Sequence, residues 1–138
     1  MTPILLDTGV IVALLDRSER AHARCREAVE GLRRQLVTCE AVIAESCYLL
    51  RGLPGAPQAV LANVANGNFQ IPFTLTSHAA AVAAILEKYR DQGMELADAC
   101  LVQMAAELGT ADVLTLDADF RIWRAARGLA FRILPGPG

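Results

Sequence analysis

Five short apolar runs, separated by longer segments with helical spacing, constrain the fold of this chain more than any other feature. The apolar runs lie at residues 4–6, 36–38, 69–73, 112–116 and 131–134. Helical spacing is expected at residues 10–15, 19–34, 40–50, 58–65, 77–89 and 96–108. Strands that alternate with helices predict an α/β fold, with a mostly parallel sheet covered by helices on both faces. Ser18 is expected to cap the second helix, and Pro72 to place the third strand at a sheet edge.

Length and composition exclude several other classes of protein. The 138 residues suit a single domain over 1–138, with a core from about 4 to 134. Hydrophobic residues make up 54% of the chain and the formal net charge is −2, the opposite of the disordered pattern. No apolar run approaches the roughly 20 residues that span a bilayer, and no signal-peptide pattern is present. We therefore expect a cytoplasmic protein, with its four cysteines reduced and packed.

Two aspartates come directly after predicted strands. Asp7 follows the apolar run at 4–6, and Asp117 follows the run at 112–116. In open parallel sheets the ligand crevice lies beyond the carboxyl ends of the strands. Both carboxylates are therefore expected at the functional edge of the sheet.

Two further carboxylates interrupt apolar stripes on predicted helices. Asp98 shares its helix face with Leu101, and Glu45 shares its face with Val42 and Leu49. Burying ionised carboxylates without a partner costs several kcal/mol per group, and neighbouring carboxylates also repel one another. The only lysine of the chain lies on a different predicted helix. A cation bound among the carboxylates would resolve this conflict.

A set of carboxylates without histidine or cysteine favours a hard divalent cation, Mg²⁺ or Mn²⁺. The candidate ligands are Asp7, Glu45, Asp98 and Asp117, with Asp119 as a fifth. Each aspartate also has a structural explanation. Asp7 can cap a helix, and Asp98 can interact favourably with a helix dipole. Asp117 and Asp119 can form turns. The occurrence of all four principal candidates together favours the metal site.

Four short motifs resemble those of the PIN-domain ribonucleases, most closely the VapC-type toxins of bacterial toxin–antitoxin modules. They are ILLDT at 4–8, VIAE at 42–45, LADA at 96–99 and LTLDADF at 114–120. The resemblance covers about residues 4–134 and implies a PIN-like three-layer α/β/α sandwich. It also implies that Asp7, Glu45, Asp98 and Asp117 are catalytic metal ligands, that Asp119 is a more variable ligand and that Thr115 supports the site. His22 is left out, because a lone histidine in an amphipathic helix is more often packed than catalytic.

By this resemblance, the protein is expected to be an endoribonuclease that uses Mg²⁺ or Mn²⁺ to hydrolyse RNA phosphodiester bonds, leaving a 5′-phosphate and a 3′-hydroxyl. The same resemblance implies that it is the toxin of a toxin–antitoxin pair. A small antitoxin would block the pocket, often with an arginine or lysine among the carboxylates, and the toxin would form a homodimer. No residue separates a toxin from a housekeeping nuclease of the same fold, which stays an open alternative, and the expectation of a toxin rests on small size and the lack of other domains.

Net charge by itself argues weakly against a nucleic-acid partner. Without the five candidate ligands, however, ten acidic residues remain against 13 basic ones, a formal +3. Six arginines flank the candidate site in sequence and could contact RNA phosphates, although a solvated helix face explains them equally well. They are Arg17, Arg20, Arg24, Arg121, Arg124 and Arg127.

Three alternative functions can be set against this interpretation. A phosphotransfer domain also uses strand-end aspartates with Mg²⁺, but it needs a lysine at the site. The related phosphatases need a second aspartate two positions after the first, where this chain has Gly9. A catalytically inactive PIN-like binding module and a DNA-directed nuclease of the same fold both remain open.

Overall fold

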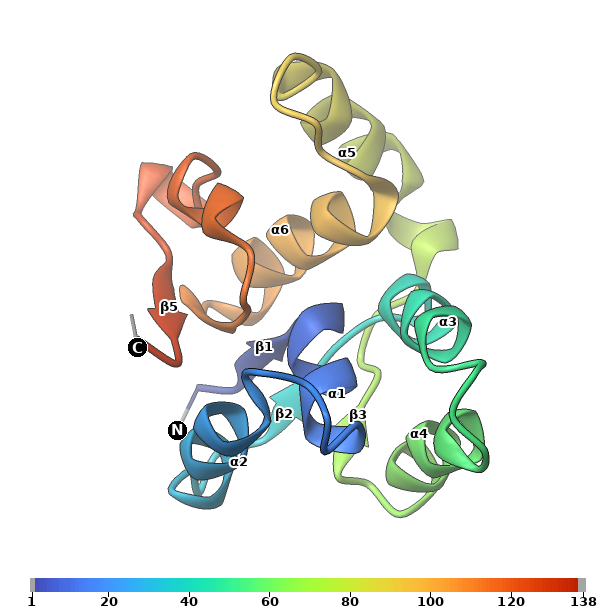
Figure 1. Ribbon diagram of the computed structural model, residues 1–138. Helices are drawn as coiled ribbons and strands as arrows, with labels where there is room; N and C mark the ends of the chain where they lie inside the picture. Colours follow the sequence, from blue (N-terminus) through green and yellow to red (C-terminus); the bar gives the residue numbers. More distant parts are fainter. Residues whose placement is uncertain (1, 137–138) are drawn as a thin grey trace.

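The computed structural model describes residues 2–136, and its centre is a five-stranded sheet (Figure 1). All five strands are parallel, in the order β3-β2-β1-β4-β5. Their bounds are β1 (Ile4–Leu6), β2 (Leu36–Val37), β3 (Phe69–Gln70), β4 (Asp112–Leu114) and β5 (Arg132–Leu134). The predicted α/β class is confirmed, and β3 lies at an edge, as Pro72 indicated.

Six α-helices connect and cover the strands in the described part of the chain. They are α1 (Thr8–Leu15), α2 (His22–Glu30), α3 (Glu40–Leu49), α4 (Ala56–Ala65), α5 (Leu75–Lys88) and α6 (Leu96–Leu108). Two short 3₁₀ helices, η1 (Ala118–Arg121) and η2 (Ala126–Gly128), lie between β4 and β5. None of the described helices combines the length and the apolar character needed to cross a bilayer.

The order of the strands places a topological switch point between β1 and β4. From β1 the chain moves outward to β2 and then β3, and it returns through α5 and α6 to β4 on the other side of β1. Because such crossovers are almost always right-handed, this reversal puts α5 and α6 on the opposite sheet face from the preceding helices. The crevice between the carboxyl ends of β1 and β4 is therefore the expected ligand site.

The central strand is buried on both faces. Ile4, Leu5 and Leu6 are all fully inaccessible to solvent, and Leu5 is aligned with Val37 of β2 and Val113 of β4. A continuous buried run of this kind is typical of a parallel sheet that helices cover on both sides. The strand thus provides a rigid base for the residue that follows it, Asp7.

The second helix differs from its prediction at both ends. It runs from His22 to Glu30, whereas the sequence predicted a helix from 19 to 34 with Ser18 as its cap. The Ser18 hydroxyl donates a 2.6 Å hydrogen bond to Oδ1 of Asp16, and the Ser18 backbone N–H donates to the same oxygen. This local turn uses the side chain that would otherwise have capped the helix.

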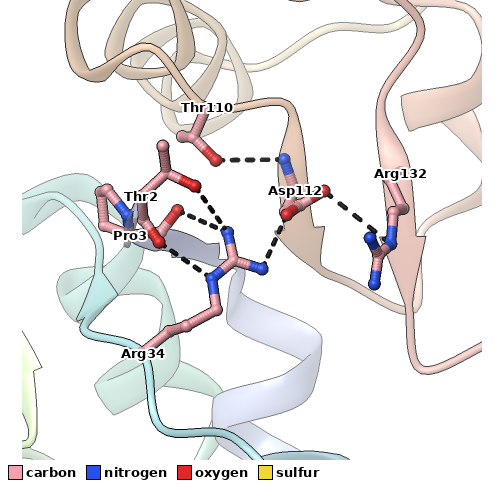
Figure 2. Close-up of polar contacts among 6 residues, drawn as sticks. All are labelled: Thr2, Pro3, Arg34, Thr110, Asp112 and Arg132. Atoms are coloured by element: carbon pink, nitrogen blue, oxygen red, sulfur yellow. Dashed lines mark hydrogen bonds and ion pairs between the residues drawn. The ribbon is translucent and has the colours of Figure 1, made fainter.

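A polar cluster at the amino ends of the strands stabilises the sheet on the side opposite the strand-end aspartates (Figure 2). The guanidinium of Arg34 lies 2.7 Å from a carboxylate oxygen of Asp112 and donates to the backbone carbonyls of Thr2 and Pro3. Arg132 approaches the other oxygen of Asp112 at 3.9 Å. Asp112 therefore has a cationic partner, whereas no ion pair within residues 2–136 involves Asp7 or Asp117.

Candidate active site

A hollow of about 280 Å³ lies beyond the carboxyl ends of β1 and β4, and we call it the acidic pocket. Four of the five predicted ligands line it, each from a different segment of the chain. Glu95 is a fifth carboxylate in its lining, and Asp119 is not among the lining residues. The lining consists of Asp7, Thr8, Gly9, Glu45, Leu49, Glu95, Asp98, Leu116 and Asp117.

Asp7 is the most deeply buried acid of the pocket, with 6% of its surface exposed. It is the N-cap of α1, where Oδ1 accepts a 2.8 Å hydrogen bond from the backbone N–H of Thr8. Its Oδ2 accepts a 2.6 Å hydrogen bond from the Thr115 hydroxyl. The cap role expected of an aspartate at this position is therefore present, and it leaves the carboxylate at the wall of the pocket.

Thr115 connects the two strand-end aspartates. Its buried hydroxyl donates to Asp7 and accepts a 3.0 Å hydrogen bond from the backbone N–H of Asp117. The Asp117 carboxylate in turn accepts a 2.9 Å bond from the backbone N–H of Asp119, which forms the turn before η1. Asp117 is exposed, and Asp119 is half-buried beyond the pocket.

Glu45 lies at the border of the buried face of α3. The sequence predicted an apolar stripe through Val42, Glu45 and Leu49, but Leu49 is 54% exposed and the buried side chains are Val42, Ile43 and Ser46. The Ser46 hydroxyl makes this face compatible with burial, because it donates to the backbone carbonyl of Val42. Glu45 is accordingly half-buried and lines the pocket from its rim.

Asp98 is held at the start of α6 by a reciprocal pair of hydrogen bonds with Glu95. Oδ2 of Asp98 accepts a 3.0 Å bond from the backbone N–H of Glu95, and the Glu95 side chain accepts from the backbone N–H of Asp98. This is the capping-box arrangement. Sequence reasoning missed Glu95, although an acid three residues before Asp98 at a helix start is the spacing of such a box.

Burial and mutual repulsion raise the pKa values of two acids in the pocket. Desolvation is the main cause of the raised pKa of Asp7, with smaller contributions from the charges of Asp117 and Glu45. Desolvation also raises the pKa of Asp98 to about 7, and the charges of Asp7 and Asp117 act in the same direction. A bound cation would remove this penalty, because opposite charge favours the ionised form.

The donor chemistry of the pocket fits a hard divalent cation. Every ionisable side chain in its lining is a carboxylate, and these ligand types suit Mg²⁺ or Mn²⁺. The buried Thr8 hydroxyl in the lining has no hydrogen-bond partner among the described residues, 2–136. Within residues 2–136, no three His, Cys, Asp or Glu side chains are gathered closely enough to enclose a metal ion. The carboxylates thus share one pocket, while Asp7 and Asp98 are held by protein hydrogen-bond donors.

The structure separates the six candidate arginines. Arg24 and Arg121 line a second hollow that shares Leu116 and Asp117 with the acidic pocket. Arg17 and Arg127 each line a different hollow, away from the carboxylates. Arg20 is exposed and lines none of these hollows, and Arg124 donates to the backbone carbonyls of the three residues before it.

His22 and the cysteines have structural positions. The Nδ1 atom of His22 lies 2.6 Å from the backbone carbonyl oxygen of Ala13, so this half-buried ring joins α2 to α1. All four cysteines are free, and Cys25, Cys39 and Cys100 are buried. These positions agree with the packed roles that the sequence indicated.

A larger hollow, of about 550 Å³, lies at the opposite end of the sheet. Its lining includes Gln35 and Leu36 at the start of β2 and Asn68 and Phe69 at the start of β3, and it contains no carboxylate. Size alone would favour it over the acidic pocket as a ligand site, and it would equally favour the hollow of about 560 Å³ that Arg17 lines. Its position at the amino ends of the strands and its lack of clustered acids favour the smaller acidic pocket instead.

Comparisons with known proteins agree with this geometry. The sequence profile of the PIN domain matches residues 4–124. Ribonuclease VapC26 of Mycobacterium tuberculosis (strain ATCC 25618 / H37Rv) is 32% identical over 135 residues, which cover 96% of this chain and all of that protein. The crystal structure of VapC20 from M. tuberculosis, a toxin that cleaves the sarcin-ricin loop, superposes with a TM-score of 0.77 at 18% identity. The superposition covers 84% of this chain and 91% of that one.

The structural match shows the shared fold, and the sequence matches extend through all four motifs, including residues 114–120. The three-layer α/β arrangement expected from the resemblance is therefore confirmed. The chain belongs to the PIN-domain family and is a homologue of the VapC ribonucleases.

Proposed function

We propose that this protein is a metal-dependent endoribonuclease, the toxin of a toxin–antitoxin pair, and that the acidic pocket is its active site. The observation that carries the proposal is the convergence of four carboxylates from four segments on one pocket at the switch point of the sheet. Homology to the VapC ribonucleases supports RNA as the substrate. The pocket has no Ser-His or Cys-His pair in its lining that could act as a nucleophile.

Asp7, Glu45, Asp98 and Asp117 are the proposed ligands of Mg²⁺ or Mn²⁺, and Asp119 has a secondary role because it lies outside the pocket lining. When bound, such a cation supplies an activated water and stabilises the negative charge that develops on the phosphate. Thr115 orients Asp7 through its hydroxyl and fixes the backbone at Asp117. The raised pKa values of Asp7 and Asp98 mean that protons compete with the cation for these two carboxylates.

The test is cleavage of a panel of end-labelled RNAs with Mg²⁺, Mn²⁺ or EDTA. Asp7→Asn and Asp98→Asn each preserve size and remove a negative charge from the pocket. Asp91→Asn is the matched control, because Asp91 is exposed in the turn after α5 and outside the pocket lining. We expect cleavage by the wild type and by Asp91→Asn only with added metal, and a loss of at least 100-fold in both pocket variants.

The products give an independent check. Hydrolysis of the proposed kind leaves a 5′-phosphate and a 3′-hydroxyl, so the downstream fragment should be ligated directly, without prior phosphorylation. Folded, metal-loaded wild-type protein that cleaves no RNA in the panel would contradict the proposal and favour a binding module. Cleavage of DNA alone would favour a DNA-directed nuclease.

We also infer that a small antitoxin covers the acidic pocket. The lining contains five carboxylates and no basic residue, so a cationic side chain of a partner would be attracted into it. Leu49 and Leu116, which are 54% and 39% exposed, add an apolar rim to the same pocket. Co-expression with the gene next to its own and co-purification of the product would test this inference.

A homodimer is the second proposed assembly. Several large apolar side chains outside the lining of the acidic pocket are exposed, and burying them against a second copy would be favourable. Sedimentation equilibrium of the purified protein should then give twice the 14.8 kDa mass of the chain. These side chains are Tyr48, Leu53, Leu61, Leu75, Ile122 and Leu129.

A further inference from the structure

A hollow of about 140 Å³ adjoins the acidic pocket, and we call it the basic hollow. Two arginines line it from opposite ends of the sequence, Arg24 of α2 and Arg121 of η1. The basic hollow and the acidic pocket share Leu116 and Asp117 in their linings. The two sites are therefore neighbours on one continuous surface.

Neither guanidinium has a competing acidic partner in the described part of the chain. The ion pairs found among residues 2–136 involve Arg26, Arg34, Arg90, Arg132 and His78, and none involves Arg24 or Arg121. Their side chains likewise make no hydrogen bond within 2–136. Two unpaired guanidiniums in one hollow attract an anion, and their planar donor forks suit phosphate in particular.

The size of the basic hollow restricts what it can hold. Pockets for drug-sized ligands have volumes of about 300–1,000 Å³, and the basic hollow is well below that range. A base together with its ribose would exceed it, whereas a single phosphate with its ordered water fits. Apolar side chains make up much of the remaining wall and offer no base-specific hydrogen bond. The polar side chains in the lining besides the two arginines are Thr115, whose hydroxyl is bonded to Asp7, and Asp117, which the basic hollow shares with the acidic pocket.

We propose that the basic hollow binds an RNA backbone phosphate next to the scissile one, with Arg24 and Arg121 as its two ligands. This inference rests on the proposed function, because it places the scissile phosphate in the acidic pocket. The bound RNA strand then passes over Leu116 and Asp117, from the acidic pocket to the basic hollow. The acidic pocket needs a bound cation to accept a phosphate, whereas the arginines of the basic hollow bind a phosphate directly. Arg24 and Arg121 are positioning residues, which hold the strand and do not touch the reacting atoms.

Binding is measured first, so that the result does not depend on cleavage. Fluorescence anisotropy of a labelled single-stranded 12-nucleotide RNA is recorded with Asp7→Asn protein in Mn²⁺ at several salt concentrations. When Arg24→Ala and Arg121→Ala are both introduced into the Asp7→Asn protein, the affinity for the RNA should fall by about tenfold or more. It should also reduce the slope of log K against log salt by about 0.7, the value for one phosphate on a single strand.

Arg26→Ala is the matched control, because Arg26 lies on the same helix as Arg24 but pairs with Glu30 at the surface. It should leave both the affinity and the salt slope unchanged. An unchanged salt slope in the double variant would overturn the inference, whether or not the protein cleaves RNA. An equal loss of RNA affinity in Arg26→Ala would show a general effect of positive charge and would also overturn the inference.

Kinetics then separate this inference from the proposed function. On an RNA that the wild type cleaves, Arg24→Ala and Arg121→Ala should each raise KM with little change in kcat, because they remove binding that the ground state and the transition state share. Absence of cleavage by the wild type would contradict the proposed function, whereas the salt slope would still decide the inference. A fall in kcat with unchanged KM would contradict the positioning role.

Discussion

The hydroxyl of Thr115 donates a 2.6 Å hydrogen bond to Oδ2 of Asp7, although the two residues are 108 positions apart in the sequence. Asp7 follows β1 and Thr115 follows β4, so this bond crosses the switch point of the sheet. It is flanked by a backbone bond from the N–H of Asp7 to the carbonyl of Leu114. The Thr115 hydroxyl also accepts a hydrogen bond from the backbone N–H of Asp117, so one buried side chain joins the two strand-end aspartates, Asp7 and Asp117.

Replacing Thr115 by valine should damage the pocket more than replacing it by serine. Thr115→Val removes the donor to Asp7 and the acceptor for the Asp117 N–H, and it should lower the free energy of unfolding by about 1–3 kcal/mol. Thr115→Ser keeps both bonds and should recover most of the stability and the metal-dependent cleavage. Urea unfolding and cleavage assays measure the two effects, and equal behaviour of the variants would contradict this role of the hydroxyl.

Thr8→Val is expected to stabilise the protein without metal. The buried Thr8 hydroxyl has no hydrogen-bond partner in the part of the chain that the structure describes, so an isosteric methyl group removes a desolvation cost of about 1–3 kcal/mol. Thr38→Val is the matched control, because its buried hydroxyl donates a 2.8 Å bond to the carbonyl of Leu6 and its loss should destabilise. Urea midpoints of the two variants should therefore move in opposite directions, and movement in the same direction would refute the prediction.

Stability of the metal-free protein should fall as the pH rises from about 4 to about 7. The pKa of Asp98 is raised to about 7 in the folded protein from an ordinary value of 3.8, so the folded state retains its proton after the unfolded chain has lost it. The free energy of unfolding then decreases with pH across this window and levels off above it.

The Asp98→Asn variant tests this dependence directly. It has no proton to lose at this position, so the decline between pH 4 and 7 should be smaller than in the wild type. Thermal unfolding in EDTA at several pH values measures the difference. The raised pKa of Asp7 acts in the same direction and should leave part of the decline in place. An identical decline in both proteins would contradict the assignment to Asp98.

Arg34→Met should reduce stability without changing the chemistry of the pocket. It leaves the half-buried Asp112 carboxylate without its 2.7 Å partner and also removes the bonds to Thr2 and Pro3 (Figure 2). A loss of about 1–3 kcal/mol is expected, because the half-buried carboxylate then depends on Arg132, which lies 3.9 Å from its other oxygen. The exposed pair of Arg26 and Glu30 should contribute less than about 1 kcal/mol.

The double variant Arg34→Met/Asp112→Asn gives the control for this prediction. Removing both charges should recover part of the lost stability, which a purely steric effect of methionine would not allow. Under conditions in which all these proteins remain folded, Mn²⁺ affinity measured by calorimetry should be unchanged. A large change in that affinity would show that the amino-end cluster is coupled to the pocket.

Local pattern was sufficient to predict the elements and most of the candidate acids. The apolar run at 4–6 was expected to be a buried strand without knowledge of its neighbours in the sheet. The runs before Asp7 and Asp117 place both carboxylates just after strands. Parallel strands bring such ends to one edge, so a common pocket for these two followed from the fold class. The carboxylates that interrupt apolar helix stripes then extended the set to Glu45 and Asp98, which line the same pocket.

Local pattern failed at two places, the hydrogen bonds of the Ser18 side chain and the buried face of α3. Ser18 was expected to cap a helix, but Asp16 accepts its hydrogen bonds two residues earlier. Leu49 was expected in a buried stripe with Glu45, but the core contacts Ile43 and Ser46 instead, so α3 is rotated relative to that expectation. Helical spacing indicates which residues share a face, and only packing against the sheet decides which face is covered.

By itself, the sequence determined the alternation of strands and helices, the α/β class and the positions of the strand-end aspartates, because these depend on the spacing of apolar residues within short segments. Only the tertiary structure decided the pairing of Thr115 with Asp7, the place of Glu95 in the pocket lining and the placement of Arg24 and Arg121 in the lining of one hollow. Contacts between distant segments depend on the strand order and on how helices pack across it. No local spacing encodes that order.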